Sequence, residues 1–194
     1  MYIPNSLFHK ILVRIFPNRR PRMLGKIRDN QKKIISKTRI SNTTFIDHPE
    51  SLELGENVYI GHHNFIEASQ GITIQEGCQL TSFIVMTSHS SHLTLRIYGK
   101  QYGGKEMKGY IKGKIEIGKY TFIGPHSTIM PDTKIGKGCI ISAYSYVKGE
   151  FPDFSIIAGN PAKVIGDTRT LDEPTLQANP SLQTNYNEWA SIDS

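Results

Sequence analysis

Two histidines, His89 and His92, lie in a polar stretch of the chain, residues 87–110, that could carry acid–base chemistry. A neutral imidazole can accept the proton of a hydroxyl group while its oxygen attacks an electrophile, and can then pass that proton to the leaving group. The chain has no Gly-x-Ser-x-Gly segment around a serine nucleophile. We therefore predict general-base catalysis by His89, without a covalent enzyme intermediate.

A six-residue period indicates the elements that must position these histidines. Such a period cannot hold one face of a helix with 3.6 residues per turn, but its even number keeps every repeat on the same side of an extended chain. Short strands joined by regular corners then form a parallel β-helix, which is the solenoid typical of hexapeptide repeats. The aliphatic members of the period are Ile111, Ile117, Ile123, Ile129, Ile135, Ile141 and Val147. The small residues four places after them are Thr121, Ser127, Thr133, Cys139 and Ser145.

The same rhythm occurs upstream in three shorter frames, which begin at Ile34, Leu54 and Ile74. Residues 87–110 skip the period, so a solenoid must extrude them as a loop from one of its corners. The chain is thus predicted to comprise a helical segment 1–33, an all-β solenoid 34–166 with loop 87–110, and a tail 167–194. An antiparallel β-sandwich is the alternative that this spacing disfavours.

The positive charge is concentrated at the N-terminus. Residues 1–40 contain 11 Lys and Arg and one acid, Asp29, whereas the rest contains 12 Lys and Arg against 16 acids. A short amphipathic helix is predicted over residues 7–16, as a cap on the first coil or, alternatively, as a contact with an anionic membrane. There is no signal-peptide core or long apolar segment, so we expect a cytoplasmic protein. The alternative is a protein that lies peripherally at the inner face of the membrane. No RNA-binding signature is present, so no nucleic-acid partner is expected.

The remaining features favour structural roles. Cys78 and Cys139 occupy small inward positions and are predicted to fill the core of a protein from a reducing compartment. The polar tail is predicted to be peripheral and partly mobile, because Pro174 directly follows the one segment, 170–173, that could begin a helix.

Three segments in this order resemble the hexapeptide-repeat acyltransferases of the left-handed β-helix fold: residues 86–96, 117–124 and 156–165. Within that superfamily the chain is most similar to the maltose and galactoside O-acetyltransferases and to the capsule or O-antigen polysaccharide acetyltransferases. The resemblance implies a left-handed β-helix, a homotrimer with active sites between subunits, and acetyl-coenzyme A as co-substrate.

The resemblance also implies roles for single residues. His89 matches the catalytic histidine of a Thr-x-His motif, and Asn64 resembles a substrate-positioning asparagine that would take part in catalysis. His92 and Arg96 are predicted to bind the acceptor. The predicted coenzyme contacts are Phe122, Gly124, Ser142, Ala143, Lys148, Asn160, Pro161, Ala162 and Lys163. Pro125 departs from the pattern, because some relatives hold the oxyanion with the amide at this position and proline has no N–H.

A metal site is the alternative that the histidine spacing disfavours. The γ-class carbonic anhydrases share this solenoid and bind zinc through histidines, including a His-x4-His pair. Here two residues separate His89 from His92, so no metal is predicted.

The leading hypothesis is therefore an acetyl-coenzyme A-dependent O-acetyltransferase acting on a sugar hydroxyl, of a surface polysaccharide or its precursor, with His89 as general base. A nucleotide-sugar N-acetyltransferase and a non-catalytic solenoid subunit are the alternatives. His89, Asn64 and Lys163 favour an enzyme, whereas Pro125 favours the non-catalytic subunit. The abundant polar residues of the loop do not identify the acceptor sugar.

Overall fold

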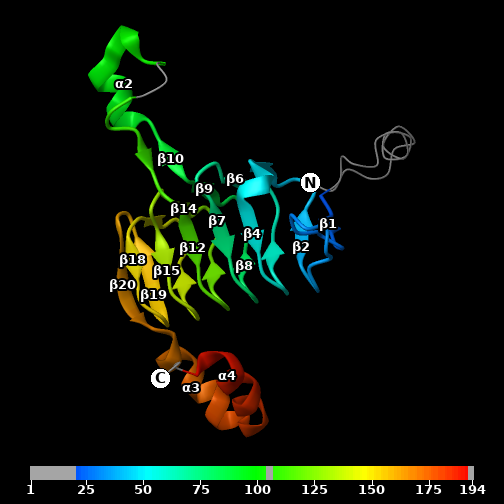
Figure 1. Ribbon diagram of the computed structural model, residues 1–194. Helices are drawn as coiled ribbons and strands as arrows, with labels where there is room; N and C mark the ends of the chain where they lie inside the picture. Colours follow the sequence, from blue (N-terminus) through cyan, green and yellow to red (C-terminus); the bar gives the residue numbers. More distant parts are fainter. Residues whose placement is uncertain (1–20, 104–106, 192–194) are drawn as a thin grey trace, which may run out of the picture.

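The computed structural model describes residues 21–103 and 107–191, in which short strands form three large sheets and one two-stranded hairpin (Figure 1). Sheet 1 contains, in spatial order, β1 (Met23–Leu24), β2 (Arg39–Ser41), β5 (Tyr59–Ile60), β8 (Gln79–Leu80), β13 (Phe122–Ile123), β16 (Ile140–Ile141), β19 (Ser155–Gly159) and β20 (Ala162–Asp167). Sheet 2 contains β3 (Phe45–Asp47), β6 (Phe65–Glu67), β9 (Val85–Thr87), β14 (Thr128–Ile129) and β17 (Tyr146–Val147). Sheet 3 contains β4 (Leu52–Leu54), β7 (Ile72–Ile74), β12 (Ile115–Ile117), β15 (Lys134–Ile135) and β18 (Glu150–Phe151).

From β2 to β19 the chain visits the three sheets in turn, and neighbouring strands within each sheet run parallel. Partners on successive coils are 20 residues apart early in the chain, as Ile40 and Ile60 are, and 18 apart later, as Ile123 and Ile141 are. Eighteen residues correspond to three hexads. The two extra residues of an early coil explain the two-residue shifts between the upstream frames. The predicted architecture of short, mostly parallel strands is confirmed, although the arm and the tail add helices. The left hand of the coil stays a prediction.

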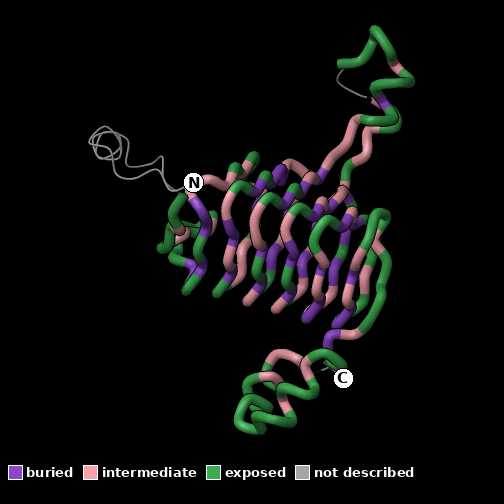
Figure 2. Tube along the Cα trace, turned by 180° about the vertical axis from the view of Figure 1, so that it is seen from behind, coloured by how far each residue is buried: buried purple, intermediate pink, exposed green. Residues whose placement is uncertain are grey.

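The side chains of the buried residues form one core cluster. Figure 2 shows that buried residues recur on successive turns of the coil. The aliphatic residues from Ile117 to Val147 are buried, and so are the small residues between them. Cys78 and Cys139 are both buried and free, as predicted. Coils approach closely at the corners, since a Cβ on Gly124 would lie 2.6 Å from the backbone nitrogen of Ala143.

Two residues that were predicted to point into the core, each at the start of a run of the six-residue period, do not do so. Ile34 is 47% exposed, and its neighbour Ile35 is buried instead. Ile111 lies outside the coil in β11 (Ile111–Lys112), which pairs antiparallel with β10 (His89–Ser90). The coil resumes at Ile115 and Ile117, so Ile111 matched the period without belonging to the core.

The excursion forms an arm that projects from the coil (Figure 1). Its base is the β10–β11 hairpin, and beyond it lie α2 (His92–Tyr98) and the 3-10 helix η3 (Gly99–Gln101). A further 3-10 helix, η2 (Pro49–Ser51), lies between sheets 2 and 3. The arm therefore rises from the corner that follows β9.

The tail is more regular than the sequence suggested. It forms α3 (Thr168–Ala178), η4 (Pro180–Leu182) and α4 (Gln183–Ala190), and Pro174 lies inside α3. The Asp167 side chain caps α3 by accepting a hydrogen bond from the amide of Arg169. Trp189 lies with its ring centre 4.7 Å from that of Tyr120 and 5.9 Å from that of Phe154, which fixes α4 against the coil. Inside α3, Pro174 lacks the backbone N–H of a helical hydrogen bond.

The predicted helix over residues 7–16 lies outside the described residues. In the part of the chain that is described, no helix has both the length and the apolar character needed to cross a membrane.

Core and surface substitutions on one strand should separate clearly. Ile135 is 2% exposed, whereas its neighbour Lys134 is exposed on the outer face of sheet 3. We expect Ile135→Ala to lower the free energy of unfolding by about 2–5 kcal/mol because it leaves a cavity. Lys134→Ala should change it by less than about 0.5 kcal/mol. Denaturant unfolding measures both, and equal losses would contradict the inward and outward assignment.

Candidate active site

His89 and a buried carboxylate, Glu67, meet where sheet 2 turns toward sheet 3. Glu67 is the last residue of β6. On the next coil β9 ends at Thr87, and His89 lies two residues further along the chain. The parallel register pairs Glu67 with Thr87, so stacking of the coils brings a residue 22 positions earlier in the chain beside His89. The Glu67 carboxylate lies 2.8 Å from Nδ1 of His89.

Hydrogen bonds hold Glu67 in its ionised form. Its Oε1 accepts the amide N–H of Ser69 at 2.8 Å, and its Oε2 accepts the amide and hydroxyl of Ser88 at 3.0 and 2.9 Å. Burial of the carboxyl raises its pKa, but the hydrogen bonds from Ser69 and Ser88 and the nearby charge of His89 outweigh burial and lower that pKa to about 2.

An ionised Glu67 selects the tautomer of His89. Nδ1 of His89 lies 2.8 Å from Oε2 of Glu67 and 3.3 Å from the Ser69 hydroxyl oxygen. A carboxylate can only accept, so its charge favours the tautomer that carries the hydrogen on Nδ1. The Nε2 atom of the neutral ring then keeps its lone pair and can act as a base. The ring is also held by Tyr110, whose ring stacks on it with centres 5.5 Å apart and planes 14° from parallel. Burial raises the pKa of Tyr110, which therefore remains an uncharged phenol beside the imidazole.

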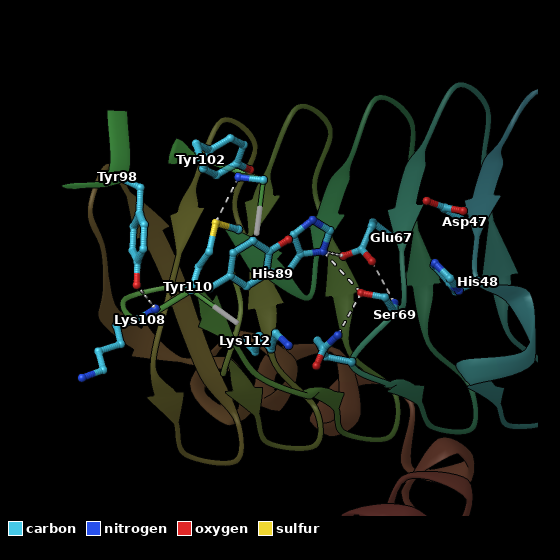
Figure 3. A pocket seen from close by; sticks show the side chains of 13 residues that line it. Asp47, His48, Glu67, Ser69, His89, Tyr98, Tyr102, Lys108, Tyr110 and Lys112 are labelled. Carbon is cyan, nitrogen blue, oxygen red and sulfur yellow. Dashed lines mark hydrogen bonds and ion pairs between the residues drawn. The ribbon is translucent and has the colours of Figure 1, made fainter. Parts of the chain in front are cut away.

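A cavity of about 880 Å³ opens beside His89, between the coil and the arm (Figure 3). The coil supplies one wall, and the arm, from Tyr98 of α2 down to Lys112 of β11, supplies the other. Its lining residues are Asp47, His48, Glu67, Ser69, Gln70, His89, Tyr98, Tyr102, Gly103, Met107, Lys108, Tyr110 and Lys112. A polar cavity that contains an oriented imidazole can receive a hydroxyl-bearing substrate.

The two predicted acceptor contacts lie elsewhere. His92 is the first residue of α2, and Arg96 lies within that helix. Both are exposed, and neither lines this cavity. Nδ1 of His92 is 2.8 Å from the Ser90 hydroxyl, and the Arg96 guanidinium donates to the carbonyl of His92 at 2.6 Å. These contacts keep the two side chains on the arm.

Asn64 is also separate from His89. Its side chain is buried at the preceding corner, where Nδ2 donates to the carbonyls of Gly61 and Thr81 at 3.2 and 2.9 Å. Its Oδ1 accepts the amide of Ile84 at 2.8 Å. These backbone contacts join successive coils, so the geometry gives Asn64 a structural role.

The predicted coenzyme contacts lie on other parts of the coil, and none lines the His89 cavity. Phe122 is outward-facing on sheet 1, beside a second cavity of about 420 Å³ that α3 and α4 help to line. Gly124, Ser142 and Ala143 follow sheet 1 strands at the corner with sheet 2. Lys148 directly follows β17 of sheet 2. The remaining contacts belong to the β19–β20 hairpin: Asn160 and Pro161, joined by a cis peptide bond, form its turn, and Ala162 and Lys163 begin β20.

Sequence reasoning missed Glu67 and Tyr110. The available signal was the 20-residue length of an early coil, which places Asp47, Glu67 and Thr87 in one row at the end of sheet 2. No short motif joins Glu67 to His89, because their contact exists only once the coils stack. In the described part of the chain, no three His, Cys, Asp or Glu side chains are grouped as metal ligands would be.

Comparison with known proteins gives transferases and acetyltransferases as relatives of this chain. Residues 114–149 match the family model described as bacterial transferase hexapeptide (six repeats). The chain is 31% identical over 124 residues to a probable acetyltransferase of Mycobacterium tuberculosis (strain ATCC 25618 / H37Rv), covering 61% of this chain and 38% of that protein. It is 27% identical over 113 residues to a putative lipopolysaccharide biosynthesis O-acetyl transferase, WbbJ, of Escherichia coli (strain K12), covering 57% of each.

The fold is shared with solved acyltransferases. AntD, an N-acyltransferase from Bacillus cereus solved with dTDP and 3-hydroxybutyryl-coenzyme A, matches with a TM-score of 0.59 at 20% identity, over 77% of this chain and 90% of that one. The resemblance to the hexapeptide-repeat acyltransferases is thus confirmed, and the segment 114–149 carries their repeat. The chain spans 38% and 57% of the length of the two curated relatives.

The depressed pKa of Glu67 predicts a specific acid sensitivity. A carboxyl whose pKa is lower in the folded than in the unfolded chain stabilises the fold above its ordinary pKa of about 4.3, and that stabilisation is lost as the pH falls. Wild-type stability should therefore decline as the pH drops toward about 2, the folded value for Glu67. Glu67→Gln should be less stable at pH 7 and should lack this part of the decline.

Thermal unfolding between about pH 7 and pH 2 measures this difference. Glu150→Gln is the matched control, because Glu150 is an exposed carboxylate on β18. The Glu67 assignment is wrong if the two variants show the same pH dependence.

Proposed function

We propose that this chain is an acetyl-coenzyme A-dependent O-acetyltransferase that modifies a sugar hydroxyl, with His89 as the general base. The observation that carries the proposal is the contact of 2.8 Å between buried Glu67 and Nδ1 of His89, beside a polar cavity. The acetyltransferase names of the curated relatives support the reaction class. A surface polysaccharide or its precursor is the proposed acceptor, which agrees with the name of the Escherichia coli relative.

The proposed reaction proceeds by direct attack. Nε2 of His89 removes the proton of the acceptor hydroxyl as its oxygen bonds to the thioester carbonyl carbon. The tetrahedral intermediate then collapses, the carbon–sulfur bond breaks, and His89 returns the proton to the coenzyme thiolate. Glu67 acts as a positioning residue, because its charge holds the reactive tautomer and stabilises the imidazolium that forms in between.

A second copy of the chain would complete the site. His89 lies at the corner between sheets 2 and 3, whereas Phe122, Gly124 and Ser142 lie on or beside sheet 1. We propose that the coil is left-handed and that threefold packing brings these parts of neighbouring subunits together to bind the coenzyme.

The outer faces of the sheets support packing through sheet 2. Its outer face carries Phe45, Phe65 and Val85, which are 58, 42 and 37% exposed. The corresponding row on sheet 3 includes the charged residues Glu53 and Lys134. Burying the apolar row of sheet 2 against another copy would be favourable, whereas burying the charges of sheet 3 would not.

The alternatives remain distinct in their chemistry. A nucleotide-sugar N-acetyltransferase would use the same imidazole to deprotonate an amine rather than a hydroxyl. A non-catalytic solenoid would have no need of a buried, ionised Glu67, and the Glu67–His89 contact therefore favours an enzyme. We also propose that the N-terminal segment contacts an anionic membrane. The chain would then have three parts: the N-terminal segment 1–33, the coil with its arm 34–166, and the tail 167–194.

The reaction can be tested by release of free thiol from acetyl-coenzyme A with a panel of neutral and amino sugars. We expect hydroxyl acceptors to be acetylated and His89→Ala to lower kcat by about 10²- to 10⁴-fold, the usual contribution of a positioned base. Coenzyme affinity should change little. His92→Ala should change kcat and the KM for the acceptor little, because His92 does not line the cavity. If His89→Ala retains more than about a tenth of the rate while His92→Ala does not, the base is His92.

Oligomeric state provides a separate test. We expect light scattering at micromolar protein to give the mass of a trimer. A paired substitution on sheet 2, Phe45→Asp with Phe65→Asp, should lower that mass, since it places charges in the apolar row. Lys134→Asp on sheet 3 is the control and should leave the mass unchanged. A wild-type monomer would contradict both the trimer and the shared site.

A further inference from the structure

Lys112 faces the proposed base directly. In the β10–β11 hairpin, Lys112 is the register partner of His89, and residues opposite one another in an antiparallel pair have neighbouring side chains. The Lys112 ammonium lies 5.4 Å from the centre of the Tyr110 ring, and that ring stacks on His89. Figure 3 shows Lys112 beside Tyr110 and His89 on the side of the arm. A positive charge is thus held next to the site of proton transfer.

In the described part of the chain this charge has an aromatic neighbour but no carboxylate partner. Among the described residues, no carboxylate forms an ion pair with Lys112 or with Lys108, the second lysine of the cavity. Among the described lysines, ion pairs are formed by Lys114, 3.3 Å from Glu116, and by Lys119, 3.8 Å from Glu76.

The acidic residues of the cavity are separate from the two lysines. Glu67 is committed to His89 and to the amides of Ser69 and Ser88. Asp47 lies beside His48 at the opposite end of the cavity from Lys108 (Figure 3). The cavity therefore has a basic side on the arm and an acidic side on the coil, and His89 lies between them.

We propose that the acceptor sugar carries a phosphate or carboxylate close to the hydroxyl that is acetylated, and that Lys112 binds this anion with help from Lys108. This inference rests on the proposed O-acetyltransferase activity and narrows its substrate class. A lysine opposite the base orients an anionic sugar so that its hydroxyl points toward Nε2 of His89. Neutral sugars lack this anchor.

Another role for Lys112 is to bind the oxyanion of the tetrahedral intermediate, and kinetics can separate the two. An oxyanion contact acts in the transition state with every acceptor, so its loss lowers kcat for neutral and anionic sugars alike. An acceptor anchor acts through KM and only on the anionic sugars.

The experiment uses the full chain, saturating acetyl-coenzyme A and matched acceptors: glucose, glucuronate and glucose 1-phosphate, with the corresponding galactose series. We expect kcat/KM for at least one anionic acceptor to exceed that for its neutral partner about tenfold or more, and the preference to fall as salt rises. Lys112→Met should remove the preference through KM and leave the neutral acceptors unchanged. Comparison of uronate with phosphate identifies which anion is recognised.

Lys134→Met is the matched control, because Lys134 is an exposed lysine on sheet 3 that is not part of the cavity. The proposal is overturned if the wild type shows no preference, or if Lys112→Met lowers kcat equally for all acceptors. Calorimetric titration with the same sugars, without acetyl-coenzyme A, tests the anion site apart from catalysis. If the sugars bind in a Lys112-dependent way but are not acetylated, the proposed O-acetyltransferase activity is refuted and the anion site stands. If binding does not depend on Lys112, the anion site is overturned.

Discussion

The candidate site depends on a carboxylate that is buried and yet ionised. Removing Glu67 from water is unfavourable, and the cost is offset because the amides of Ser69 and Ser88 donate to its two oxygens and Nδ1 of His89 lies 2.8 Å from one of them. Those donors come from two successive coils, so they converge only when the coils are stacked in register. The same backbone pairing that builds the solenoid therefore also sets the tautomer of His89.

The fold was largely predictable because its period is written in the sequence. Inward residues such as Ile123 and Ile141 must recur on the same side of the chain, and that constraint leaves few other architectures. The period shows where the coil is interrupted but not where it resumes. Ile111 kept the rhythm by coincidence inside the arm, and the Trp189 packing that orders the tail depends on Tyr120 and Phe154, which are distant in sequence.

The site was predictable only in part, for a related reason. His89 follows the last regular hexad before the arm, so a break in the period identifies it. No break in the period identifies Glu67. It lies beside His89 because one coil is 20 residues long, and the sequence shows this length only through the two-residue shifts between frames. Asn64 shows the opposite case, in which a residue suggested by resemblance is fully engaged with the backbone of its own corner.

The division between coil and arm separates two functions of the proposed enzyme. The rigid coil provides Glu67 and the start of β10, and hence the orientation of the base. The base of the arm provides Tyr110, which stacks on the same imidazole, and Lys112, the register partner of His89; both line the cavity. Changes in an extruded arm do not disturb the core of a solenoid, whereas changes at a stacked position such as Glu67 do. Acceptor choice can therefore vary through the arm while the proton-transfer geometry remains tied to the stacking of the coils.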